Sequence, residues 1–306
     1  MTPRFLFFNP RDGRLRAGWR LLAQQLVLVF ALLVLEDYLT ASLKPSLSQN
    51  GLWILEAVVG CIAFGVSVWL AGKWFDKRPF ADFGFHLSRH WWGQMGFGMA
   101  LGAVLMALIF LVEWLLGYVR VIEFGVTVEP GASLAWALTV MFIHYIGIAF
   151  TEELLTRGYI LKNLLEGFAL QSSPVLGKTL AVLVSSVIFA LPHAGNPNAT
   201  PLGIAILVLF GVLCAVAVLL TNELALPIGF HLTWNFFQGN IFGFPVSGWE
   251  LRGGTLLFIE QSGPAWLTGG GFGPESGLIG MAAVLFGMVF LYLKFKPVRI
   301  ETEPHP

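Results

Sequence analysis

Apolar runs of membrane-spanning length follow one another along most of the chain. A helix needs about 20 apolar residues to cross a bilayer. Runs of this kind lie near 20–42, 52–72, 93–117, 132–166, 175–193, 201–221, 224–241 and 277–294. The pattern predicts an all-α, polytopic membrane protein, a bundle of eight transmembrane helices that forms a single membrane-embedded domain over residues 1–306.

Composition agrees with this pattern and excludes one class of partner. The chain is 56% hydrophobic and 12% charged, whereas soluble domains carry about 25% charged residues. The formal net charge is zero, so there is no basic surplus to neutralise phosphates, and nucleic acid is not an expected partner. Cys61 and Cys214 both lie in apolar stretches. They are more typical of buried thiols than of a disulfide, and they do not indicate a redox compartment.

Lysine and arginine predict the orientation, because basic residues concentrate on the cytoplasmic side of membrane proteins. Of the 18 basic residues, Arg157 lies inside a span. With a cytoplasmic N-terminus, only Lys44, Arg120 and Arg252 fall on the outer side, and the other 14 fall inside. This asymmetry favours cytoplasmic N- and C-termini and therefore an even number of spans, which supports the short and polar 224–241 run. The basic N-terminal segment lacks a small-residue cleavage site and is interpreted as an interfacial lead-in.

Three ionisable residues interrupt the fourth apolar run. Glu152, Glu153 and Arg157 lie within FIHYIGIAFTEELLTRGYIL, residues 142–161, where one charged residue costs roughly 2.5–3.5 kcal/mol. Glu153 and Arg157 are four apart and can pair on one helix face. Glu152 points about 100° away and has no partner in its own helix. These residues could have no function beyond structure: Glu153 and Arg157 would then form a plain salt bridge within the helix, and Glu152 would reach the membrane edge.

A histidine in the next span is expected at the depth of Glu152. Spans four and five form a hairpin with its apex near 167–177, and the distances along the two helices place Glu152 level with His193. Pro192 should break the helix beside the imidazole. A lone histidine in a membrane helix more often serves packing, and we expect that role for His144.

The seventh run carries His231 and Asn235, four residues apart and hence on one face. The alternative is an interhelical hydrogen-bonding face, which we expect of Thr233 and Gln238. Together these polar groups suit hydrolysis by an activated water, with a carboxylate as general base and other donors stabilising the oxyanion. They equally suit ion or proton transport. Glutamate and histidine can also hold zinc, although the HExxH signature is absent.

The motifs around these residues resemble those of a known family. EELLTR (Glu152, Glu153, Arg157) is similar to EExxxR, FALPH (Phe189, His193) to FxxxH, and HLTWN (His231, Asn235) to HxxxN. This is the CPBP or Abi family of intramembrane proteases, which includes the type II CAAX prenyl endopeptidases. GRLRAGWRLL, RPFADFGF and WLTGGGFGPESG extend the resemblance over most of the chain and toward the bacterial branch, with a motif core near 132–241.

The resemblance implies an intramembrane endopeptidase, a hydrolase that cuts membrane-associated, in some cases prenylated, proteins or peptides. It assigns Glu152 to water activation, His193 to holding that water, and His231 and Asn235 to the oxyanion. Glu153, Arg157 and Phe189 would support the site structurally. The family is described both as metalloprotease and as metal-free. A zinc ion, if present, would be held by Glu152, His193 and His231; no cofactor is certain. The expected location is the bacterial inner or plasma membrane, as a multi-pass protein.

Two alternatives come from other classes of function. A non-catalytic self-immunity or partner-binding protein would keep the motifs for structure, and intact Glu152 argues against it. A transporter is disfavoured by the lack of paired inverted halves. For a hydrolase, we expect the four residues Glu152, His193, His231 and Asn235 to line one cavity, with Glu152 and His193 about one water apart and the other two on the opposite wall. Residues 242–276 are expected to be a surface loop, or alternatively a lid.

Overall fold

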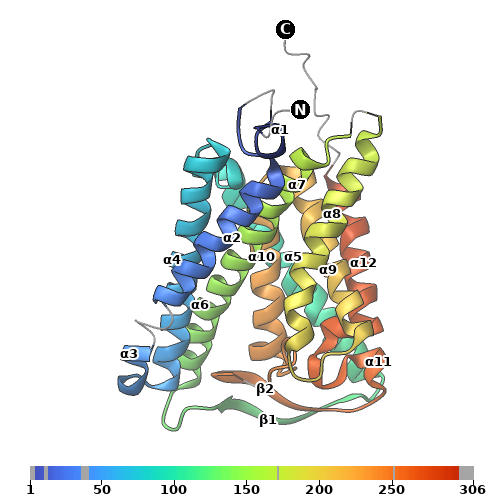
Figure 1. Cartoon of the computed structure of the whole chain (residues 1–306). Coiled ribbons are helices and arrows are strands. Elements are labelled where there is room, and N and C mark those ends of the chain that lie inside the picture. Colours follow the sequence, from blue (N-terminus) through green and yellow to red (C-terminus); the bar gives the residue numbers. More distant parts are fainter. Residues whose placement is uncertain (1–3, 10–12, 36–40, 171, 251, 296–306) are drawn as a thin grey trace.

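The computed structural model describes residues 4–9, 13–35, 41–170, 172–250 and 252–295, and 74% of it is helical. Long helices run back and forth along one axis (Figure 1). They are α2 Ala17–Val34, α4 Gln49–Ala71, α5 Arg89–Leu115, α6 Leu134–Glu153, α8 Pro174–Ala190, α9 Pro201–Thr221, α10 Ala225–Phe236 and α12 Leu278–Lys294. Short helices are α1 Arg4–Phe7, α3 Ala41–Leu43, α7 Lys162–Gly167 and α11 Ala265–Thr268.

Six helical segments of the described chain are long and apolar enough to cross a membrane. They are 17–34, 49–76, 89–115, 134–167, 174–195 and 201–221. The prediction of a helical, multi-pass membrane protein is thereby confirmed. The seventh and eighth predicted spans coincide with α10 and α12, which fall short of that length, so eight crossings stay a prediction. The start of α2 and the end of α12 lie at the same end of the bundle (Figure 1); that this end is cytoplasmic stays a prediction too.

Helix α6 does not stop after its two glutamates. It continues through a π-helical segment, η5 Leu154–Leu161, into α7. Helix α10 is likewise extended by a π-helical segment, η7 Phe237–Ile241. A π-helical turn widens the helix and re-aims its side chains, and such turns are frequent at functional sites. Both segments adjoin motif residues, because η5 contains Arg157 and η7 follows Asn235 by two positions.

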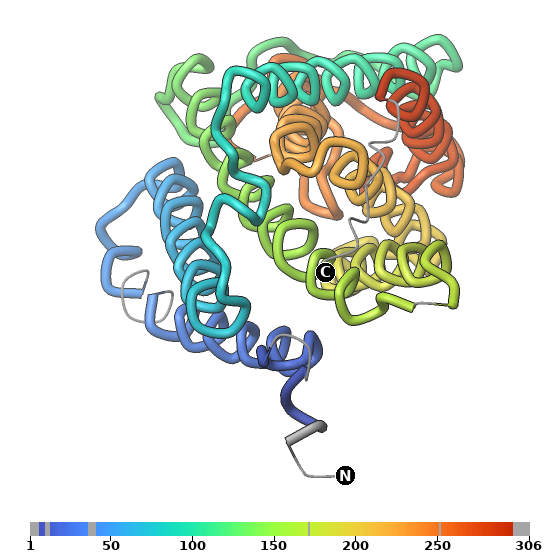
Figure 2. Tube along the Cα trace, turned by 90° about the horizontal axis from the view of Figure 1, so that it is seen from above, coloured from blue at the N-terminus to red at the C-terminus, as the bar shows by residue number. Residues whose placement is uncertain are grey.

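Helix α10 lies in the centre of the bundle, with other helices around it (Figure 2). All residues from Ala225 to Trp234 are buried. Its contact with α5 depends on glycine: a Cβ at Gly98 would lie 2.2 Å from the Leu226 carbonyl oxygen, and one at Gly229 would lie 2.3 Å from that of Met95. Thr233 donates a 2.7 Å hydrogen bond to the Met99 carbonyl across this contact. Thr233 thus has the interhelical role that the sequence predicts.

Two strands cross the end of the bundle opposite the start of α2 (Figure 1). Strand β1, Val119–Thr127, pairs antiparallel with β2, Gly254–Gln261, in a register from Val119 opposite Gln261 to Thr127 opposite Gly254. The prediction of an all-α fold is therefore wrong in this detail. The two strands are far apart in the sequence, and their pairing depends on helices that bring them together.

A polar cluster fastens α2 at the other end of the bundle. The Arg20 guanidinium contacts Asp76 at 2.8 Å and Glu166 at 2.7 Å, and the Tyr159 hydroxyl donates to Asp76 at 2.8 Å. These bonds join α2 to the end of the α4 segment, to η5 and to α7. Helix α2 is thereby held beside the helix that carries Glu152.

Candidate active site

Arg157 is fully buried and organises the charged turn that follows α6. Its guanidinium donates to Glu153 Oε1 at 3.1 Å and to the Gly211 carbonyl of α9 at 3.1 Å. It also lies 4.2 Å from the ring centroid of Phe189 on α8. The expected pair between Glu153 and Arg157 is present, and it is enclosed by two further helices. Both side chains have zero exposure, so the pair belongs to the interior and not to the membrane edge.

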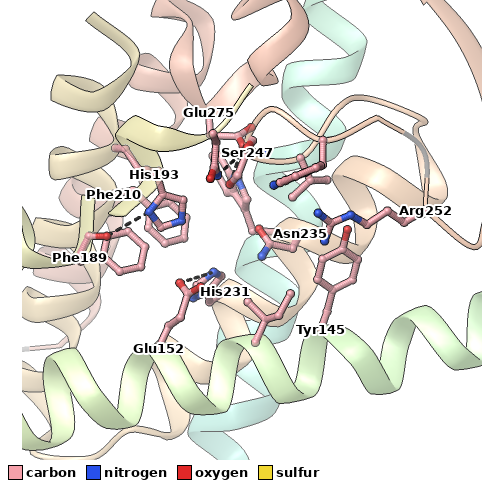
Figure 3. A pocket seen from close by; sticks show the side chains of 16 residues that line it. Tyr145, Glu152, Phe189, His193, Phe210, His231, Asn235, Ser247, Arg252 and Glu275 are labelled. Carbon is pink, nitrogen blue, oxygen red and sulfur yellow. Dashed lines mark hydrogen bonds and ion pairs between the residues drawn. The ribbon is translucent and has the colours of Figure 1, made fainter. Parts of the chain in front are cut away.

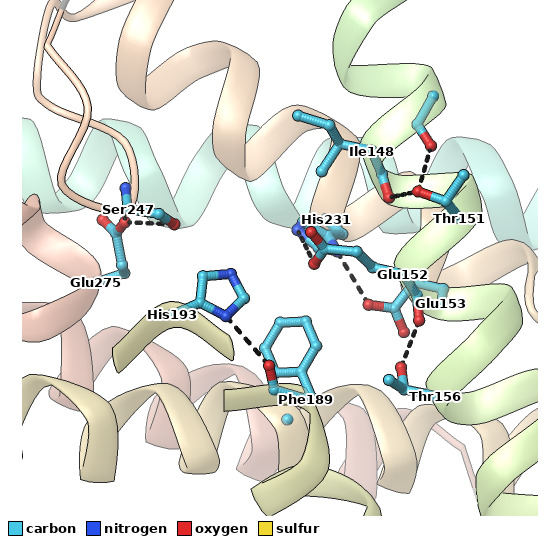
Figure 4. Close-up of polar contacts among 12 residues, drawn as sticks. Ile148, Thr151, Glu152, Glu153, Thr156, Phe189, His193, His231, Ser247 and Glu275 are labelled. Carbon is cyan, nitrogen blue, oxygen red and sulfur yellow. Dashed lines mark hydrogen bonds and ion pairs between the residues drawn. The ribbon is translucent and has the colours of Figure 1, made fainter. Parts of the chain in front are cut away.

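His231 bonds to the same carboxylate from the central helix α10. Its Nδ1 lies 2.9 Å from Glu153 Oε1 (Figure 4). A carboxylate that pairs with arginine is ionised and only accepts hydrogen bonds, so Nδ1 of His231 carries the hydrogen. Its Nε2 then faces Glu152 Oε2 at 3.9 Å, too far for a direct hydrogen bond. His231 thus stands beside Glu152. The expectation that it lies on the opposite wall is wrong, because α10 occupies the bundle centre next to α6.

His193 is held by its own turn of helix. It lies in the 3₁₀ segment η6, Leu191–Gly195, which directly follows α8 and contains Pro192. Its Nδ1 lies 3.1 Å from the Phe189 carbonyl oxygen (Figure 4). A carbonyl only accepts, so this nitrogen also carries the hydrogen. In the neutral ring Nε2 is therefore left as an acceptor.

One cavity of about 180 Å³ contains the residues that the sequence singles out. Glu152, His193, His231 and Asn235 all line it (Figure 3). They come from α6, η6 and α10. The structure thus brings these four side chains together, whereas Glu153 and Arg157 lie behind the cavity wall and Phe189 forms part of it.

Five further polar residues line this cavity and were not predicted: Tyr145, Asn196, Ser247, Arg252 and Glu275. Three of them belong to 242–276, so the expectation of a plain surface loop is wrong. Glu275 is only 4% exposed, and its Oε1 accepts from the Ser247 backbone N–H at 2.6 Å while its Oε2 contacts the Gln238 amide. Burial raises the pKa of Glu275 to about 7, against the opposing effect of these donors. The only signal in the sequence is the glycine-rich stretch that ends in PESG.

The turn at Ser247 is clamped between two other loops. The Asn196 amide donates to the Ser247 carbonyl at 2.8 Å, and the Gly248 N–H donates to the Phe272 carbonyl at 2.7 Å. Gly248 has a φ of 86°, and a Cβ there would lie 2.0 Å from the Pro197 carbonyl oxygen. This turn therefore connects the loop after His193 with the glycine-rich segment, and it closes one side of the cavity.

An apolar groove of about 410 Å³ adjoins the polar cavity. The two spaces share Glu152, Phe189 and His193. The groove is further lined by Leu21, Phe64, Leu155, Ile160 and Ile188. It lies between α2, α4, η5 and α8. The polar cavity and the apolar groove therefore meet at Glu152, Phe189 and His193.

The residues proposed for zinc are not arranged as a metal site. Within the described part of the chain, no three histidine, cysteine, aspartate or glutamate side chains are grouped closely enough to hold a metal ion. Glu152, His193 and His231 share a cavity, but they do not converge on one point.

Membrane-length helices around a buried polar cavity define a multi-pass membrane protein with an internal site. Residues 134–237 match the family model described as Rce1-like, type II CAAX prenyl endopeptidase. This confirms the resemblance to the CPBP, or CAAX-protease, family, and it implies a protease, hence a hydrolase. No curated protein and no solved structure matches the chain. The matched segment contains all three motifs, from α6 to the start of η7.

Proposed function

We propose that the protein is an intramembrane endopeptidase in which Glu152 activates the attacking water. One observation carries the proposal. Glu152 Oε2 is enclosed and has no hydrogen-bond partner among the described residues, although it faces a polar cavity with three other polar motif side chains. A buried carboxylate oxygen without a partner is costly. A water molecule that bridges it to a neighbouring acceptor would satisfy it.

His193 is the acceptor that such a water requires. Because its Nδ1 hydrogen is donated to the Phe189 carbonyl, Nε2 of the neutral ring can accept one hydrogen of the water. Glu152 accepts the other. The water oxygen then has its lone pairs directed at a substrate carbonyl in the cavity. This arrangement supports His193 as a positioning residue for the water.

In this reaction Glu152 takes one proton from the water and later gives it to the leaving group. The water gives a proton to the Glu152 carboxylate as its oxygen bonds to the carbonyl carbon, and the carbonyl oxygen becomes an oxyanion. When the carbon–nitrogen bond breaks, Glu152 returns that proton to the departing nitrogen. The products are a carboxylic acid and an amine.

The oxyanion needs donors that are already in place. The Asn235 amide lines the cavity and has no hydrogen-bond partner among the described residues, so both its hydrogens are available. His231 can donate from Nε2 only when the ring carries two hydrogens, because Nδ1–H is committed to Glu153.

The neighbouring groove supports a membrane-bound substrate, with or without a prenyl group. A peptide with an apolar anchor could enter from the bilayer side and place its scissile bond between Glu152 and His193. Because the anchor is already out of water in the bilayer, van der Waals packing of the anchor against the groove would hold the chain in place. Substrate entry from the membrane is therefore part of the proposal.

The test is cleavage of anchored peptides, farnesylated and unmodified, by the purified protein in liposomes. Glu152→Gln should lower kcat by roughly 10²- to 10⁴-fold, since an amide cannot take the proton. The control is Glu123→Gln, an exposed glutamate on β1, which should match the parent. Undiminished turnover by Glu152→Gln would exclude this role. A non-catalytic binding protein or a transporter would show no cleavage in either form.

A further inference from the structure

Arg252 is a cation in the candidate active site that the proposed reaction does not use. It lines the same cavity as Glu152, Tyr145 and Asn235 (Figure 3). Arg252 is one of the three basic residues that the sequence predicts on the outer side of the membrane. The other two are Lys44 and Arg120, which are exposed.

Two tryptophan rings hold the Arg252 side chain. Its guanidinium carbon lies 5.1 Å from the ring centroid of Trp53 on α4 and 4.9 Å from that of Trp249. In a cation–π contact the cation lies over the face of the aromatic ring. Such a contact satisfies no N–H donor of the guanidinium, so the two rings orient the group and leave its hydrogen bonds to other partners. The backbone is fixed as well, because Asn240 donates to the Arg252 carbonyl at 2.9 Å.

The charge of Arg252 has no counter-ion in contact. Among the described residues, no carboxylate lies within ion-pair distance of this guanidinium, and no acceptor is hydrogen-bonded to it. Glu56 and Tyr145 act on its charge only from a greater distance, while burial lowers the pKa of Arg252. The side-chain nitrogens of Arg252 are not among the enclosed, unpartnered polar atoms of the described residues, so their N–H donors are accessible to a ligand in the cavity. The planar fork of arginine matches a carboxylate with two parallel hydrogen bonds.

We infer that Arg252 binds a carboxylate of the substrate and so selects which peptides enter the site. The inference rests on the proposed peptidase function and names a substrate class for it. The carboxylate can be a free α-carboxylate at the end of the chain or an acidic side chain. The cavity volume of about 180 Å³ lies below the roughly 300–1,000 Å³ of typical ligand pockets. Such a space suits the short end of a chain better than a chain that continues.

The test measures binding and cleavage separately. Three lipid-anchored hexapeptides are compared. Two have the same sequence, one with a free C-terminus and one with a C-terminal amide, and the third is an amide in which glutamate replaces the last residue. The full-length protein should bind and process the free acid roughly 10- to 100-fold better than the plain amide, with the difference in KM. Recovery by the glutamate peptide would assign the carboxylate to a side chain; its absence would assign it to the chain end.

Three variants complete the experiment. Arg252→Gln should remove the preference, so that the variant binds and processes the free acid no better than the amide. Arg252→Lys should keep only part of the preference, and Arg120→Gln should change nothing. Equal binding of acid and amide by the parent, or an unchanged preference in Arg252→Gln, overturns the inference. If the parent binds the acid selectively but cleaves no peptide, the peptidase proposal fails and carboxylate recognition stands. Thermal unfolding of each variant shows that it is folded.

Discussion

Replacing Arg157 by alanine tests whether the buried charge network holds the site together. The change leaves Glu153, which has zero exposure, with His231 as its remaining partner. It also removes the bond to the Gly211 carbonyl and the contact with the Phe189 ring. Breaking a buried ion pair on one side costs about 3–5 kcal/mol. At about 2 °C per kcal/mol for a large chain, the melting temperature should fall by roughly 6–10 °C.

The assay is thermal unfolding of the purified protein in detergent, with peptide cleavage measured in parallel. The control is Arg120→Ala on β1, whose pair with Glu260 is 74% and 61% exposed and should contribute at most about 1 kcal/mol. The double variant Glu153→Gln, Arg157→Met removes both charges and should recover much of the stability lost in Arg157→Ala. A melting temperature for Arg157→Ala within 2 °C of the parent, a bound set by about 1 kcal/mol, would show that the pair is not buried in the working protein.

Two further predictions concern the wall of the cavity that residues 242–276 form. Because the pKa of Glu275 is raised to about 7 from 4.5, the fold favours its protonated form; the associated stability is fully present below pH 4.5 and is lost as pH rises through 7. Relative to Glu275→Gln, the parent should therefore lose about 3 kcal/mol between pH 5 and pH 9, seen as a shrinking difference in melting temperature; a constant difference would count against it. Gly248→Ala, at φ 86°, should destabilise the protein by about 1–3 kcal/mol and lower peptide turnover, and normal kinetics would show that the turn can move freely.

Local patterns in the sequence were sufficient for the helices and for the polar residues that break them. A run of 20 apolar residues has few alternatives to a helix in a membrane, because every backbone group must be hydrogen-bonded within the chain. The spacing of four residues likewise placed Glu153 and Arg157 on one face, and it placed His231 and Asn235 on one face of the seventh predicted span. The geometry of a single helix determines which side chains share a face, so neighbouring helices are not needed to predict it.

Contacts between helices were not decided in this way. Periodicity places His231 and Asn235 on one face of the helix, but it does not say which neighbouring helix that face meets. The sequence therefore predicts His231 across the cavity from Glu152, whereas His231 Nε2 lies 3.9 Å from Glu152 Oε2. Its position depends on glycine contacts between α5 and α10, which put α10 in the centre. In the same way, the four-residue spacing predicts the pair of Glu153 with Arg157, but it does not predict the hydrogen bond between His231 Nδ1 and Glu153 Oε1.

The segment 242–276 is where local sequence patterns predict least of the structure. Glycines, a serine, an arginine and a glutamate without periodicity carry no local signal beyond a loop, and the strand pair joins segments separated by more than a hundred residues. Only the tertiary structure places Ser247, Arg252 and Glu275 in the wall of the cavity. The sequence by itself determined which helices form and which polar residues they bury. The packing of those helices decided which polar groups meet, because hydrogen bonds and ion pairs depend on distances of a few ångströms that no periodicity specifies.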